Sequence, residues 1–137
     1  MGAFTQDNRL INITTPLPKD ALLLSGITGF EAISQMFHFT LDMAAENTEK
    51  VDFDKLLGQP ATAEILLHNG GSRYINGIIS KLTRTFRGTT FTGYVAELVP
   101  KLWLLTKNRQ SRIFQHKNVP DILKEVLEAH GIEKAFE

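Results

Sequence analysis

Residues 37–43 alternate without interruption between apolar and polar side chains. Phe37, Phe39, Leu41 and Met43 form the apolar set, and one polar residue separates each of them from the next. Successive side chains of a β-strand point to opposite faces, so this period of two predicts a strand with one buried and one solvated face. The rest of the chain must then supply strands that pair with it.

Turn-forming residues divide the flanking chain into segments of strand length. Asn69-Gly70-Gly71 predicts a hairpin, because these residue types tolerate positive φ. Arg87-Gly88 indicates the next turn of the same meander. The expected strands are residues 21–27, 37–43, 61–68, 74–86 and 89–99.

A short helical turn is expected over residues 53–57, between two of these strands. Asp52 can cap its start, and Gly58 and Pro60 then end it. Regular strands joined by short turns favour a closed or partly closed antiparallel barrel, since closure hides the strand edges. The predicted fold class is mainly β with a few short helices (β-rich α+β), an antiparallel barrel-like domain followed by a C-terminal helix.

The last third of the chain changes character. Residues 100–105 predict a short helix or a packed turn, with Trp103 as a large anchor. Residues 111–115 are expected to be extended. Up to this point the chain is assigned to one β-barrel domain, over residues 1–115, and residues 116–137 are assigned to a separate helical segment.

The C-terminal helix has signals at both ends. Asn118 can cap its start, and Pro120 falls in the first turn, where a missing N–H is harmless. Asp121 faces the positive end of the helix dipole, and Gly131 provides the stop. Apolar residues recur at helical spacing along one face. They are Val119, Ile122, Leu123, Val126 and Leu127.

Length and composition exclude several classes of protein. A chain of 137 residues fits one ordinary domain. It contains no cysteine, so a disulfide framework, a thiolate metal site and a cysteine nucleophile are excluded. The longest apolar runs, such as residues 21–24, are far below the roughly 20 residues of a membrane helix. Residues 1–9 lack the features of a cleavable signal, so we expect a cytoplasmic origin.

The charges are unevenly distributed although they sum to zero. Residues 81–117 carry eight basic side chains and one acidic one, a net charge of +7, whereas residues 1–80 carry −4 and residues 118–137 carry −3. A basic block can bind phosphates. Aromatic residues do not interleave with these bases as in a single-strand binder, so the sequence favours a solvated face or a protein interface over nucleic-acid binding.

Candidate chemical sites are weak. The four histidines lie far apart in the sequence and have no zinc-site spacing. Ser111, His116 and Asp121 have the residue types of a hydrolase triad, but no nucleophile elbow surrounds the serine. The acidic loop around Asp52 and Asp54 lacks the pattern of an EF-hand. No catalytic residue, cofactor or metal site is therefore expected.

Five blocks of sequence, in order, resemble the VgrG family. They are residues 22–39 (LLL followed by GFEAIS and FHF), 56–62 (LLGQPAT), 73–79 (RYINGII), 98–106 (LVPKLWLLT) and 111–123 (SRIFQ followed by VPDIL). The family-motif residues in these blocks are Leu57, Gly58, Gln59, Pro60, Gly77, Trp103, Arg112, Phe114, Gln115, Val119, Pro120, Ile122 and Leu123. We expect them to act structurally, with no catalytic role.

The resemblance implies a part of the type VI secretion machine. VgrG proteins look like a phage-tail hub fused to a piercing spike, with three copies around one axis. The hub sits between the tube of stacked Hcp rings and the tip. The resemblance therefore implies a homotrimer in the full-length protein, contacts with the Hcp tube and with other baseplate and effector proteins, and a membrane contact only through the spike tip. It implies a cytoplasmic location before firing and secretion or delivery into a target cell afterwards.

Ordinary members of the family are several times longer than this chain. Residues 1–115 then correspond to a phage-tail-hub-like barrel, and residues 116–137 to the start of the next hub segment. The spike and any effector extension lie outside the sequence, so we expect a fragment or a truncated product. A freestanding β-barrel binding or adaptor module is the alternative function, and an enzyme is a third.

Overall fold

The computed structural model describes residues 4–132, and the chain forms two compact units, Met1–Pro100 and Lys101–Glu137. The boundary predicted between residues 115 and 116 falls inside the second unit. The reason is local: the side chain of Lys101 donates a hydrogen bond to the carbonyl of Gly131, so the start of this unit contacts its end. The assignment of domains stays a prediction, and residues 133–137 of the predicted helical segment lie outside the described residues.

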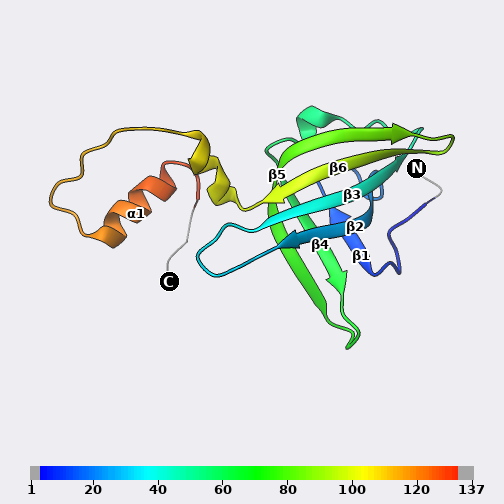
Figure 1. Cartoon of the computed structure of the whole chain (residues 1–137), viewed down its shortest axis with the longest axis horizontal. Coiled ribbons are helices and arrows are strands. Elements are labelled where there is room, and N and C mark those ends of the chain that lie inside the picture. Colours follow the sequence, from blue (N-terminus) through cyan, green and yellow to red (C-terminus); the bar gives the residue numbers. More distant parts are fainter. Residues whose placement is uncertain (1–3, 133–137) are drawn as a thin grey trace. The chain divides into compact units, whose positions relative to one another are not determined.

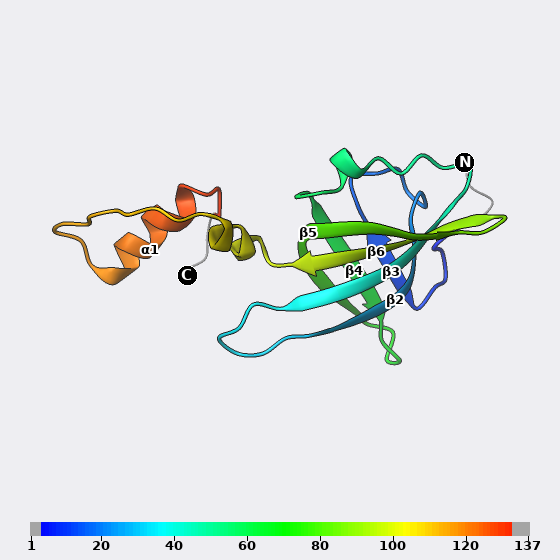
Figure 2. The same ribbon diagram turned by 45° about the horizontal axis from the view of Figure 1, so that its top comes forward.

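The first unit is one six-stranded antiparallel sheet in the order β1-β4-β5-β6-β3-β2. Figures 1 and 2 show the strands curving into a half-barrel. The predicted class, mainly β with few helices and a barrel-like sheet, is confirmed. The strands are β1 Ile11–Thr14, β2 Leu23–Phe30, β3 His38–Glu46, β4 Pro60–Leu66, β5 Ser72–Arg87 and β6 Phe91–Val99.

The alternation in β3 places its apolar side chains in the core. Phe39, Leu41 and Met43 are buried, and Asp42 between them is exposed. β3 pairs with β6, whose Leu98 is fully buried. Removing these side chains from water is the main favourable contribution to folding. The largest fully buried side chains are Leu24, Leu41, Leu56, Ile79 and Leu98.

The turns form where the sequence predicts them. In the β4–β5 hairpin Gly70 has φ 81°, and the side-chain oxygen of Asn69 accepts a hydrogen bond of 3.0 Å from the backbone N–H of Gly71. The short helix η1, Phe53–Lys55, begins at Asp52, whose carboxylate accepts from the N–H of Asp54 at 3.1 Å. Both predictions are confirmed, because they depend on local backbone geometry alone.

The strand β1 is absent from the sequence prediction. It pairs with β4 at one edge of the sheet, and it also lies against β2, the strand at the other edge. The buried side chain of Gln6 bridges these edges. Its amide nitrogen donates to the carbonyl of Ile13 at 3.0 Å, and its oxygen accepts from the N–H of Ile13 at 2.8 Å and from the N–H of Leu24 at 3.5 Å. A side chain thus satisfies backbone groups that a closed sheet would pair with a further strand.

The second unit contains the 3₁₀ helix η2, Lys101–Lys107, and the helix α1, Val119–Glu128. The carbonyl of the Asn118 side chain accepts a hydrogen bond of 2.9 Å from the N–H of Asp121, as the sequence predicts for the cap. Gly131 has φ 65°, a conformation that favours glycine, and follows the helix as its stop. Between the two helices the chain has no regular secondary structure.

Candidate interaction sites

Three of the motif blocks in the first unit meet at one corner of the sheet. The N–H of Gly58, at φ 72°, donates to the carbonyl of Ile79 at 2.8 Å, and the N–H of Ile79 donates to the carbonyl of Gln59 at 3.1 Å. Leu57 forms an isolated parallel bridge with the same isoleucine. This ladder holds the segment before β4 against β5.

Gly77, in the same block as Ile79, brings the third block to this corner through its close approach to Val99. A Cβ atom at this position would lie 2.5 Å from the carbonyl oxygen of Val99 on β6, which is closer than a real Cβ can approach. Glycine therefore allows β5 and β6 to come together here. Pro60 is the first residue of β4, a position where a strand tolerates the missing N–H. These motif residues hold backbone in place, and none of them forms a chemical site.

The loop between β2 and β3 exposes apolar side chains. Ile33 is 96% exposed, Phe30 is 56% exposed and Met36 is 38% exposed. An ion pair between Glu31 and Arg73 connects this loop to β5. Exposed apolar side chains grouped on one loop are typical of a surface that contacts another protein.

Trp103 does not occupy a core. It is half-buried, and η2 contains no buried residue. The ammonium of Lys107 lies 4.3 Å from the centroid of its ring, a cation–π contact at the surface. The short helix predicted over residues 100–105 forms as η2, whereas the packed anchor predicted for Trp103 is wrong within the described residues, because η2 contains no buried residue.

The apolar face of α1 is only partly covered within the second unit. Leu127 is buried and Ile122 is half-buried, whereas Val119 is 68% exposed and Leu123 is 43% exposed. Pro120 and Gln115 are also exposed. Most family-motif residues of this region are thus exposed, whereas Phe114 and Ile122 are half-buried.

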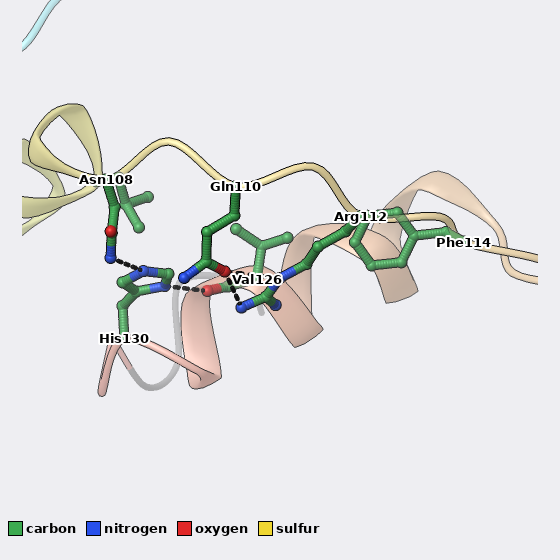
Figure 3. A pocket seen from close by; sticks show the side chains of 7 residues that line it. Asn108, Gln110, Arg112, Phe114, Val126 and His130 are labelled. Carbon is green, nitrogen blue, oxygen red and sulfur yellow. Dashed lines mark hydrogen bonds between the residues drawn. The ribbon is translucent and has the colours of Figure 1, made fainter.

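A pocket of about 260 Å³ opens between the loop after η2 and α1, within the second unit. Figure 3 shows the polar side chains of Asn108, Gln110, Arg112 and His130 along it. Its apolar lining is Leu105, Phe114 and Val126. The pocket brings the motif residues Arg112 and Phe114 together with α1, a combination that sequence spacing does not reveal.

Hydrogen bonds orient the polar side chains of this pocket. The side-chain oxygen of Gln110 accepts from Nε of Arg112 at 3.0 Å and from Nη2 at 2.7 Å. Nε2 of His130 lies 3.2 Å from the amide nitrogen of Asn108, and Nδ1 lies 2.9 Å from the carbonyl oxygen of Val126. The amide nitrogen of Asn108 donates and the carbonyl of Val126 accepts, so these two contacts fit a ring that accepts at Nε2 and donates from Nδ1.

The alternative chemical sites considered from the sequence find no geometry in the described part of the chain. No hydrogen bond or ion pair joins Ser111, His116 and Asp121 within residues 4–132. Over the same residues, no group of three or more histidine, aspartate or glutamate side chains is arranged to hold a metal ion. None of the helices described in residues 4–132 has the length and apolar character needed to cross a membrane.

Comparison with known families and proteins finds similarity to phage tail hub and type VI secretion spike proteins. The model of the phage tail baseplate hub (GPD) family matches residues 30–137. The type VI secretion system spike protein VgrG1b of Pseudomonas aeruginosa is 36% identical over 129 residues, which cover 94% of this chain and 17% of that protein. VgrG1c of the same organism is 34% identical, with 93% and 18% covered. VgrG3 of Vibrio cholerae is 30% identical, with 85% and 12% covered.

A solved structure shares the fold. The Escherichia coli c3393 protein superposes with a TM-score of 0.73 at 19% identity, over 92% of this chain and 33% of that chain. It is a component of the type VI secretion system and is described as similar in structure to the T4 bacteriophage tail proteins gp27 and gp5. The chain spans less than a fifth of the length of the three spike proteins it matches.

Proposed function

The chain belongs to the phage tail baseplate hub family, in which it is VgrG-like, and from this premise we propose that it is a structural hub component of a type VI secretion tail spike. One observation carries the proposal: the relatives are type VI spike proteins, and the likeness to VgrG1b covers 94% of this chain. The shared fold with c3393 supports it independently of sequence identity.

A finer placement within the secretion machine is a further part of this proposal. We propose that in the full-length protein three copies form a ring between the Hcp tube and the piercing tip, in contact with other baseplate and effector proteins. The ring is cytoplasmic before firing and is then secreted or delivered. The exposed apolar side chains Phe30, Ile33 and Met36 would suit contacts made in such an assembly.

We propose that the chain works without catalysis. The motif residues at the corner of the sheet support this, because Gly58, Gln59 and Gly77 contact backbone atoms of neighbouring strands. Their contacts hold neighbouring segments of the sheet together, which is a structural role.

The test is made in the full-length gene of the source organism. The intact mass of its product comes first, and a mass several times that of 137 residues is expected. A product of only this length would favour the alternative, a freestanding β-barrel module. In the full-length protein we then expect a trimer by native mass spectrometry and loss of Hcp from the culture medium when the gene is deleted.

A matched pair of variants connects that result to this part of the protein. Gly77→Val distorts the contact between β5 and β6, whereas Gly88→Ala changes a turn glycine whose added Cβ would meet its nearest neighbour at 3.4 Å. We expect Hcp release to fail with the first variant and to persist with the second. Full Hcp release with a Gly77→Val protein that no longer folds in this region would refute the hub role.

A further inference from the structure

The pocket of the second unit combines an apolar wall with one oriented cation. Leu105, Phe114 and Val126 form the wall. Figure 3 shows the guanidinium of Arg112 beside Phe114 and Val126. At about 260 Å³ the pocket is smaller than the roughly 300–1,000 Å³ typical of sites for drug-sized ligands and cofactors. It has the size for one or two amino-acid side chains.

Arg112 is held in place but retains most of its binding capacity. A guanidinium has five N–H donors, and the oxygen of Gln110 accepts from two nitrogens, Nε and Nη2. The remaining three donors have no partner within residues 4–132. A planar fork with free parallel donors matches the two oxygens of a carboxylate.

His130 does not compete for the same ligand. Both of its ring nitrogens are engaged, with Asn108 and with the carbonyl of Val126. The ring of His130 therefore lines the pocket with both nitrogens occupied, and Arg112 is the group with free donors that a ligand meets.

The surrounding charge favours an acidic ligand. Residues 99–119 contain five basic side chains and no acidic one, and residues 120–132, which include most of α1, add one lysine and three acidic side chains, so the net charge over residues 99–132 is +3. Within residues 4–132 only Lys117 among these five pairs with a carboxylate, that of Glu125. Lys101 donates to a backbone carbonyl, and Lys107 lies over an aromatic ring. The uncompensated positive charge attracts anions and disfavours cations at this surface.

We propose that this pocket binds a glutamate or aspartate side chain that a protein segment presents next to an apolar residue. The carboxylate pairs with Arg112, and the apolar neighbour packs on Leu105, Phe114 and Val126. The site is thus a binding site for an acidic–apolar peptide segment. This proposal stands on the pocket alone and does not depend on the hub role.

The test uses the whole chain, labelled with ¹⁵N, and two matched peptides. The probe is acetyl-Leu-Glu-Leu-amide, and the control is acetyl-Leu-Gln-Leu-amide, which has the same shape without the charge. We expect the glutamate peptide to shift the NMR signals of the Arg112 Nε–H and the Val126 amide, and to bind about threefold to fivefold more tightly than the control. Arg112 is exposed, and an exposed ion pair contributes a factor of that order.

Two substitutions separate a specific pair from general attraction. Arg112→Gln is expected to reduce the affinity for the glutamate peptide to that for the control, whereas Arg109→Gln, in the same basic loop but outside the pocket lining, should change it less than about twofold. Phe114→Ala should weaken both peptides alike, since it removes apolar wall. Unchanged signals from α1 verify that each variant is folded.

Several results would overturn the proposal. Equal affinity for the two peptides would show that the carboxylate is not recognised. An equal loss with Arg109→Gln, or an equal response of Arg112 to inorganic phosphate alone, would reduce the site to a general basic surface. The absence of any shift at peptide concentrations of about 10 mM would mean that the pocket does not bind this class of segment.

Discussion

The side chain of Gln6 provides the sharpest test of the fold, because it satisfies backbone groups at the opening of the half-barrel. It accepts from the N–H of Ile13 at 2.8 Å and donates to the carbonyl of the same residue at 3.0 Å. Gln6 is 7% exposed and Ile13 is 5% exposed, so water cannot readily replace these bonds. The substitution Gln6→Leu keeps a similar volume and removes both.

The magnitude follows from the two groups left without partners. A buried donor or acceptor that loses its partner costs about 1–3 kcal/mol. The N–H and C=O of Ile13 lose their partners, and the N–H of Leu24 loses its longer bond of 3.5 Å. With partial relaxation of the edge strand β1, we expect Gln6→Leu to lower the free energy of unfolding by about 2–4 kcal/mol. A loss of that size would be a large fraction of the 5–15 kcal/mol typical of a domain.

Two measurements test this prediction. Urea unfolding gives the change in stability, with Gln59→Leu as the control, since that exposed side chain forms no hydrogen bond within residues 4–132. Hydrogen exchange gives the local effect, and the amide of Ile13 should exchange much faster in Gln6→Leu. If the free energy of unfolding falls by less than about 0.5 kcal/mol and the amide of Ile13 exchanges as slowly as before, the hydrogen bonds from the Gln6 side chain do not stabilise the fold.

Three further predictions concern packing and charge. Gly77→Ala should lower the free energy of unfolding by about 1–3 kcal/mol in urea melts, because its Cβ would lie 2.5 Å from a carbonyl oxygen. The control Gly88→Ala should change the free energy of unfolding by less than about 0.5 kcal/mol. Equal effects of the two substitutions would contradict the close approach at Gly77. Trp103→Ala should lower the free energy of unfolding by only about 1–2 kcal/mol, as followed by circular dichroism, which is less than the roughly 3–5 kcal/mol of a buried aromatic side chain. A larger loss would mean that Trp103 is packed in a core. Hydrogen bonds from the hydroxyl of Ser72 and then from a neighbouring tyrosine lower the pKa of Glu64, so its contribution to stability is present above its ordinary pKa and is lost as the pH falls through the lowered one. In an NMR titration Ser72→Ala should raise the pKa of Glu64, and an unchanged pKa would contradict this cause.

The proposed peptide site and the hub role depend on different residues of the chain and can be tested separately. The hub role depends on the folded corner of the sheet around Gly77 and on assembly of the full-length protein. The peptide site depends on Arg112 in the second unit. Loss of peptide binding with intact assembly would leave the hub role standing, and the reverse result would leave the pocket as an independent binding site.

Local signals in the sequence predict most of the elements. The alternation in residues 37–43 corresponds to β3, the turn at residues 69–71 joins β4 to β5, and Asn118 caps α1. Each of these depends on interactions within a few residues, namely side-chain alternation, positive φ or a cap hydrogen bond. The motif blocks also indicate the family, because they appear in order along most of the chain.

Contacts between distant segments could not be derived in the same way. β1 is four residues long, too short to stand out in the sequence, and it forms because β4 offers an edge and Gln6 satisfies its other side. Trp103 looks like a core residue by size, but exposure depends on what surrounds it, and the second unit has little to cover it. The pocket at Arg112 arises only when the loop after η2 lies against α1. Sequence alone thus determined the local elements and the family, since both depend on residues that are close together in the chain. Only the tertiary structure decided burial, edge closure and the pocket, because these depend on residues far apart in the chain.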